Sequence, residues 1–201
     1  AVTYLRALEA GGMSLDAGAA SVFNDGLLQG MLSLGPGSAV LINQGTIEDT
    51  MVASIWDVIV GNMGSDSIVN FGLIHANGTP GRSNIDSGGG NDTVVNFGTI
   101  EGGYFIREFG LLSDNDTMAD SLVNFGTMQR IIASLGSDTL ENHGTLGVIE
   151  AGGGNDRVVN TGIVYGFGGP IEYAINGGYG SDTIINQGVL YGGMVDAAGN
   201  G

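Results

Sequence analysis

Short apolar runs recur along the whole chain, and each is followed by Asn, one variable residue and Gly. In "TVVNFGTI", residues 93–100, Val94, Asn96, Gly98 and Ile100 occupy the alternate positions that an extended strand turns to one face. Eight such units occur, each with an apolar residue two before the Asn and another four after it. The pattern predicts pairs of short β-strands joined by a tight bend at Asn-x-Gly. The repeated asparagines are Asn24, Asn43, Asn70, Asn96, Asn124, Asn142, Asn160 and Asn186.

The spacing of these asparagines indicates how the strands are arranged. Successive members lie 19, 27, 26, 28, 18, 18 and 26 residues apart. The shortest spacing fits one coil of a small parallel β-solenoid, in which stacked neighbours bury the face that no unit can bury alone. We therefore expect a single all-β domain over residues 1–201, a parallel right-handed β-solenoid of about eight coils. Longer units add roughly eight residues, which we expect to form outward loops or an extra side at 49–57, 77–85, 104–112 and 165–173.

The Asn row itself has a structural interpretation. Inward Asn side chains stacked from coil to coil can hydrogen-bond to one another and to the backbone of the bend, so that every buried amide is satisfied. The Gly two residues later then provides space where the chain turns beside this ladder. We therefore expect the Asn row to have a structural role and no role in catalysis.

Composition and charge narrow the range of functions. The chain carries 39 Gly, no Cys, and 21 acidic residues against five basic ones, for a net charge of -16. Such an acidic surface argues against nucleic acid and anionic membranes as partners, and no apolar run is long enough to insert into a bilayer. The balance suits a cation-rich location outside the cell. Because the chain begins at Ala, we expect a processed segment of a longer precursor.

A second row lies four residues before each repeat Asn and is acidic in six of the eight units. Gly-rich turns precede it, and "GGYGSDTII", residues 177–185, fits the G-G-x-G-x-D-x-apolar-x nonapeptide. This stretch resembles the RTX calcium-binding β-roll family, in which Asp carboxylates and turn carbonyls of adjacent coils hold Ca²⁺. The resemblance implies a Ca²⁺ cofactor with Asp92, Asp138, Asp156 and Asp182 as its ligands. A metal-free turn, whose carboxylates accept from local backbone N–H groups and hydroxyls, is the alternative. The full acidic row is Asp66, Asp92, Asp120, Asp138, Asp156 and Asp182, with Ala20 and Ala39 in the first two units.

The whole repeat unit suggests a second family. RTX repeats run in tandem, whereas this chain has one acidic turn per unit. Strings such as "GGGNDTVVNFGTIEGG", residues 88–103, resemble the repeat passengers of bacterial autotransporters and filamentous adhesins, which are parallel β-solenoids. The resemblance implies a structural or adhesive module, extracellular or on the bacterial cell surface. Its expected partners are further copies stacked end to end or other surface proteins. The RTX-like alternative is a module that folds only with Ca²⁺.

Two further observations bear on function. His75 and His143 are the only histidines, and five scattered Arg make a poor sugar groove, so we expect no enzyme activity. The outward position before the Asn forms an apolar stripe, broken only by Glu141, and a soluble monomer rarely exposes such a stripe. Either the aromatic-rich long segments cover it or another subunit does. The stripe comprises Phe23, Ile42, Val69, Val95, Val123, Val159 and Ile185, and Phe71, Phe97 and Phe125 extend it at the position after the Asn.

Overall fold

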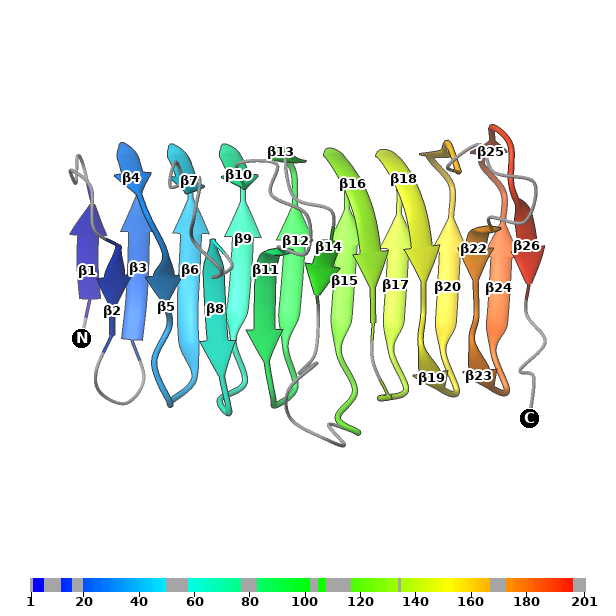
Figure 1. Ribbon diagram of the computed structural model, residues 1–201, viewed down its shortest axis with the longest axis horizontal. Coiled ribbons are helices and arrows are strands. Elements are labelled where there is room, and N and C mark those ends of the chain that lie inside the picture. Colours follow the sequence, from blue (N-terminus) through cyan, green and yellow to red (C-terminus); the bar gives the residue numbers. More distant parts are fainter. Residues whose placement is uncertain are drawn as a thin grey trace.

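The computed structural model confirms an all-β parallel solenoid. Every strand pairing in the described part of the chain is parallel, and within that part there is no helix. The strands stack side by side along the long axis of the molecule, from the N-terminal to the C-terminal end (Figure 1). The structure describes residues 2–5, 12–15, 20–49, 58–76, 83–101, 105–107, 117–133, 135–166 and 173–196.

One sheet collects the strands that end in the repeat Asn, and we call it the Asn sheet. Its strands pair without register shifts, so that each Asn lies opposite the Asn of the next coil. Strand β1 adds a ninth member and places Leu5 opposite Asn24. The repeat pattern did not predict this strand, because "VTYL" lacks the Asn-x-Gly signal. The strands are β1 (Val2–Leu5), β3 (Ala20–Asn24), β6 (Ala39–Asn43), β9 (Ser67–Asn70), β12 (Thr93–Asn96), β15 (Ser121–Asn124), β17 (Thr139–Asn142), β20 (Arg157–Asn160) and β24 (Thr183–Asn186).

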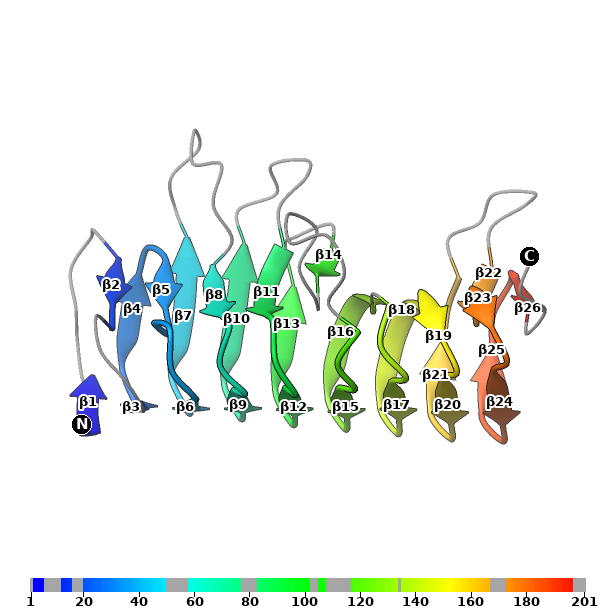
Figure 2. The same cartoon turned by 90° about the horizontal axis from the view of Figure 1, so that it is seen from below.

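A second sheet continues each coil beyond the bend (Figure 2). It first contains strands that follow the Gly, namely β4 (Leu27–Gln29), β7 (Thr46–Asp49), β10 (Leu73–Ala76), β13 (Thr99–Glu101), β16 (Thr127–Ile132), β18 (Thr145–Glu150), β21 (Ile163–Val164) and β25 (Val189–Leu190). It then contains the strands that lead into the Gly-rich turn, namely β2 (Met13–Ser14), β5 (Leu32–Ser33), β8 (Ile59–Asn62), β11 (Ser83–Gly88), β14 (Phe105–Arg107), β22 (Tyr173–Asn176) and β26 (Met194–Asp196). In that turn the short strands β19 (Gly153–Gly154) and β23 (Tyr179–Gly180) pair with each other.

The second sheet shows where the long coils differ from the short ones. In the two 18-residue units, β16 and β18 each run straight through both strand positions of the second sheet. Strand β16 pairs with β13 at Met128 and with β14 at Ile132, and β18 pairs with both β21 and β22. In three of the four longer coils the extra residues therefore enter between two halves of what is otherwise one strand, whereas in the coil of β13 and β14 most of them follow Arg107. The predicted outward loops fall mostly outside the described residues.

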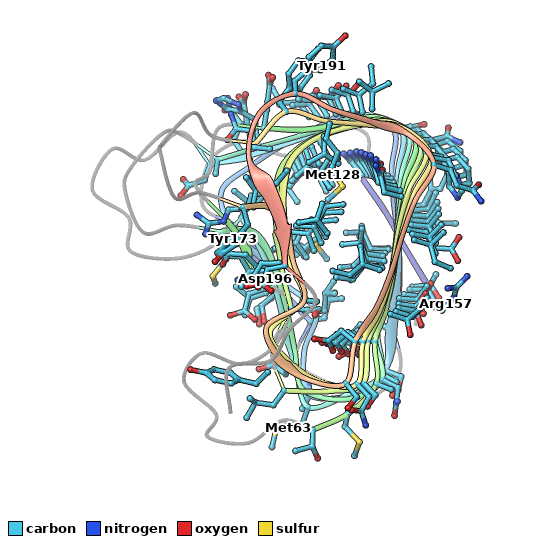
Figure 3. All side chains as sticks on the ribbon, turned by 90° about the vertical axis from the view of Figure 1, so that its right-hand side faces the viewer. Met63, Met128, Arg157, Tyr173, Tyr191 and Asp196 are labelled. Carbon is cyan, nitrogen blue, oxygen red and sulfur yellow. The ribbon has the colours of Figure 1, made fainter. Side chains whose placement is uncertain are left out.

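The core consists of axial rows of aliphatic side chains. Seen along the axis, the coils superpose and their inward side chains fill the interior, with Met128 inside and Arg157, Tyr191 and Met63 on the outside (Figure 3). The inward placement predicted for the positions two before and four after each Asn is confirmed in the central coils. Burial of each such aliphatic side chain contributes about 1.5–3 kcal/mol. Fully buried examples are Val94, Ile100, Leu122, Leu140, Leu146 and Val158.

The bend at Asn-x-Gly requires glycine because two backbones approach closely. A Cβ on Gly98 would lie 2.1 Å from the carbonyl oxygen of Gly72 in the preceding coil. The amides of Phe97 and Gly98 both donate to the carbonyl of Asn70, at 2.7 and 3.1 Å. Successive bends are thus hydrogen-bonded to one another and cannot accommodate a side chain at this position.

Candidate functional site

The Asn row forms a buried ladder whose amides are satisfied. In a central coil, Asn96 Nδ2 donates to Asn124 Oδ1 at 2.9 Å. It also lies within hydrogen-bond distance of the carbonyls of Gly98, at 3.2 Å, and Thr127, at 3.3 Å. The same amide-to-amide bond joins every successive pair from Asn24 to Asn186 at 2.7–2.9 Å. The ladder therefore serves coil-to-coil cohesion, as its spacing predicts, and leaves little hydrogen-bonding capacity for a ligand.

The acidic row forms a second ladder, directed into the solenoid. Asp156 Oδ1 accepts from the backbone N–H of Asp138 at 2.8 Å, and Asp182 Oδ1 accepts from that of Asp156 at 3.0 Å. Asp66 Oδ1 accepts in the same way from Ala39, at 2.7 Å. The donors are backbone N–H groups, as the metal-free alternative requires, but they belong to the preceding coil and not to the turn of the Asp itself. The remaining members, Asp92, Asp120 and Asp138, bond in the same manner to Asp66, Asp92 and Asp120.

The second carboxyl oxygen distinguishes the two ladders. In Asp66, Asp156 and Asp182 the Oδ2 atom is buried and has no hydrogen-bond partner. Loss of hydration favours the neutral carboxylic acid, and it raises the pKa of Asp66 to about 6 and that of Asp156 to about 7. The bond from the backbone N–H opposes this change in pKa only in part. Near neutral pH the carboxyls of Asp66 and Asp156 are therefore close to the point at which the protonated and the charged form exchange.

A row of small residues makes room for the carboxyls. A Cβ on Gly61 would lie 2.9 Å from Asp66 Oδ2, and one on Gly177 would lie 2.6 Å from Asp182 Oδ2. The position five residues before the Asp is described in five coils. In each of them it is buried and is occupied by Gly, Ala or Ser. The row is Gly61, Ser87, Ala133, Ala151 and Gly177.

The first two coils contain the reverse combination of sizes. They carry Ala20 and Ala39 in the acidic row, and the residues five before these are Leu15 and Leu34. Leu34 is fully buried, and Leu15 packs against the core. The larger residue of each pair thus lies in the acidic row in the later coils and five residues earlier in the first two coils. This relation was not predicted, although the fixed offset of five residues is visible in the sequence.

The four predicted calcium ligands lie in one inner column. Asp138, Asp156 and Asp182 belong to successive coils, while Asp92 lies two coils before Asp138. Ca²⁺ needs about six to eight oxygen ligands. Within the described part of the chain, no three His, Asp or Glu side chains gather as a metal centre would require. An ion in this column would therefore need backbone carbonyls for most of its coordination. A further acidic pair in the sequence, Asp114 and Asp116, lies outside the described residues.

The outer side of the Asn sheet is the other candidate surface, and we call it the outer sheet face. It consists of the outward rows three before, one before and one after each repeat Asn, on strands β3 to β24. Phe71, Phe97 and Phe125 are about half exposed and stack at centroid distances of 4.9 and 5.0 Å. The ring of His143 continues the stack at 4.9 Å from Phe125. The row one before the Asn is only partly buried, so the apolar stripe predicted from the sequence reaches the surface.

The two aromatic residues of the long segments whose side chains are described, Tyr165 and Tyr173, do not cover this stripe. Of these, Tyr165 is half exposed and stacks instead on Tyr191, at a centroid distance of 5.3 Å. Tyr173 lies on β22, in the second sheet. Trp56, Tyr104 and Phe109, and the side chain of Phe105, lie outside what the structure describes.

The His143 side chain has polar neighbours on both sides of the ring. Its Nδ1 atom lies 2.7 Å from Thr161 Oγ1, and its Nε2 atom lies 3.3 Å from Glu141 Oε2. The Thr161 hydroxyl also lies 3.5 Å from the carbonyl oxygen of Asn142. These contacts fasten the end of the aromatic stack to the neighbouring coil on an open sheet surface.

Among the residues that the structure describes, none forms a helix of the length and hydrophobicity that crossing a bilayer demands. Comparison of the chain with known protein families, curated proteins and solved structures found no match.

Proposed function

We propose that the chain is a non-enzymatic structural module, an adhesive or spacer rod on the cell surface or outside the cell. It acts within a longer surface protein or by stacking end to end into a fibre. Two features support this role: both buried polar rows are used for coil-to-coil bonds, and the last coil keeps a partly exposed core.

The two ladders, which bond each coil to the next, carry the proposal, and the last described coil shows the surface on which a further coil can stack. Val158, Asn160 and Val164 are fully buried, whereas their counterparts one coil later, Ile184, Asn186 and Leu190, are partly or fully exposed. The backbone edge of β24 and β25 ends the hydrogen-bonded stack in the described part of the chain. Another coil laid on this end would bury apolar side chains and pair strand edges at once.

The direction of the ladders restricts how such stacking can occur. Each Asn Nδ2 donates to the following coil, and each Asp N–H also donates to the following coil. The C-terminal end of both ladders is thus a donor end. At the N-terminal end, β1 places Leu5 in the Asn register. The two ends differ chemically, so a fibre of these rods would join head to tail rather than head to head.

Light scattering and electron microscopy test this proposal. We expect particles that lengthen as the protein concentration rises, and we expect Ile184→Lys to stop the growth by placing a charge at the stacking end. Val189→Lys is the matched control, because Val189 is 47 % exposed and points away from the core. Unlimited growth of the Ile184→Lys chain, or a strictly non-growing wild type, would contradict end-to-end association.

A calcium-binding module is the second candidate. The buried Oδ2 atoms of Asp156 and Asp182, in successive coils and without hydrogen-bond partners, favour it. A cation between the coils would offset their repulsion. Circular dichroism and thermal unfolding with added Ca²⁺ or with chelator test this candidate. It requires loss of β structure or a lower unfolding temperature in chelator, and unchanged curves would exclude it.

A further inference from the structure

The outer sheet face is almost free of charge in a strongly acidic chain. Asp25, Glu141 and Arg157 are the charged residues of its three rows, beside the titratable His143, whereas the whole chain has 21 acidic and five basic residues. Its central strands β9, β12 and β15 present only uncharged residues outward. These are Ser67, Thr93 and Ser121 in one row, Val69, Val95 and Val123 in the next, and Phe71, Phe97 and Phe125 in the third.

The geometry of the aromatic row indicates which kind of partner fits. The rings of Phe71, Phe97 and Phe125 are nearly parallel, with interplanar angles of 4° and 5°. Their faces are used against one another, and their edges point outward. A sugar ring or a nucleobase, which stacks on a free aromatic face, would find none between them. An apolar sheet surface can pack against such edges and against the neighbouring valines.

We propose that the outer sheet face packs against the same face of a second copy of this chain. Two copies that each carry a net charge of -16 repel each other when their acidic surfaces face one another. The outer sheet face is the surface on which two copies can come close with the least charge repulsion. Eight strands about 4.8 Å apart and three rows about 15 Å wide give roughly 550 Å² per partner. The total of about 1,100 Å² is near the lower limit for a specific interface.

Symmetry selects an antiparallel arrangement of the two rods. A two-fold axis parallel to the strands sets each row against itself, so that the aromatic row meets the aromatic row and Phe97 lies opposite Phe125. An axis parallel to the rods would instead set the aromatic row on the Ser/Thr row. The first arrangement places the central strands β12 and β15 at the middle of the interface. This contact does not rest on the proposed function, because end-to-end stacking uses a different surface.

Sedimentation equilibrium of the full chain tests the proposal. The Ile184→Lys background keeps end-to-end growth out of the measurement. We expect a closed dimer of about twice 20.4 kDa at concentrations near 100 µM. Val95→Glu with Val123→Glu should weaken dimerisation at least about 100-fold, because four unpaired charges would be buried. The matched control, Leu27→Glu with Val189→Glu, adds the same charge at exposed positions outside the face and should still dimerise.

Crosslinking provides a readout that does not depend on folding of the glutamate variant. The chain has no cysteine, so a single introduced thiol reports position. A short bismaleimide should join two Ser121→Cys chains near the dimer centre and should not join two Ser21→Cys chains, which lie near opposite ends. A monomeric parent, a dimer that survives in folded Val95→Glu/Val123→Glu protein, or equal crosslinking at both positions would overturn the proposal.

Discussion

The two buried ladders run side by side through the same coils, yet they satisfy their polar atoms to different degrees. The amide of Asn96 donates to a side chain and lies within reach of two carbonyls, and its oxygen in turn faces the amide of Asn70. The carboxyl of Asp156 has one oxygen bonded to backbone and one oxygen buried without a partner. An amide is both donor and acceptor and can repeat indefinitely, whereas a carboxylate only accepts. The Asn ladder should therefore contribute cohesion, and the Asp ladder should add sensitivity to protons or cations.

Removing one amide from the middle of the Asn ladder should have the largest effect. Asn96→Ala removes the side-chain partner of Asn70 Nδ2 and of Asn124 Oδ1, and it leaves the carbonyls of Gly98 and Thr127 without this donor. We expect a loss of about 3 kcal/mol or more in the free energy of unfolding, measured in urea.

The matched control for this substitution is Asn186→Ala. Asn186 is exposed and accepts only from Asn160 in the described contacts, at 2.8 Å. The expected loss there is about 1 kcal/mol. Equal losses at the two positions would mean that burial of the amide does not set its contribution.

Changing the sizes of the side chains at and beside the Asp ladder should have the next largest effect on stability. Ala151→Leu inserts a large side chain beside the Asp156 carboxyl, and it should lower stability by about 1–3 kcal/mol. Adding Asp156→Ala recreates the pairing found at Leu34 and Ala39 in the second coil. The double variant should therefore be more stable than the sum of the single effects predicts, by about 1 kcal/mol or more. Strict additivity of the two changes would contradict volume exchange between the rows.

Folding stability should depend on pH through the Asp ladder and not through the Asn ladder, and the effect should be moderate. Burial raises the pKa of Asp156 to about 7 and that of Asp66 to about 6, from 3.8. The folded chain thus binds these protons more tightly than the unfolded chain. The stability they contribute is fully present below about pH 4, and it is lost as pH rises through 6 to 7.

Asp156→Asn isolates this contribution, since the amide can still accept from the N–H of Asp138. The unfolding temperature of wild type relative to Asp156→Asn should fall as the pH rises from about 4 to about 7. Asp25→Asn, at an exposed position, controls for the loss of one carboxyl. A difference that is constant with pH would show that Asp156 does not hold its proton in the folded chain.

The external stack should contribute least. Phe97→Ala removes two ring contacts at a half-exposed position, and we expect a loss of about 1 kcal/mol. Gln187→Ala, in the same row beyond the aromatic run, should change stability by a few tenths. Measurement below the dimerisation range keeps the two effects of Phe97 separate. A loss as large as that of Asn96→Ala would place the outer row on a par with the inner ladder.

Much of the fold was predictable from the sequence because the repeat Asn anchors positions on both sides of it. Val94, Asn96 and Ile100 follow a strict period of two, and the structure buries all three. Strand β1 was not predicted, because its pairing with β3 depends on the neighbouring strand and not on a motif of its own. The partner of the Asp156 carboxyl was equally hidden, since it is set by how one coil lies on the next. In the sequence, Ala151 has no feature that marks it as important. Its role as the small residue beside the acidic row is evident only from the structure.

The uninterrupted path of β16 has a consequence for how such rods can diversify. At the position between Gln129 and Arg130, three longer coils carry additional residues between two separate strands, namely between β7 and β8, between β10 and β11, and between β21 and β22. Both ladders lie away from this point and keep their register in either kind of coil. Foreign peptide segments grafted there would be displayed along one edge of the rod at intervals set by the strand spacing. The scaffold thus separates what can vary in evolution from what must stay constant for folding.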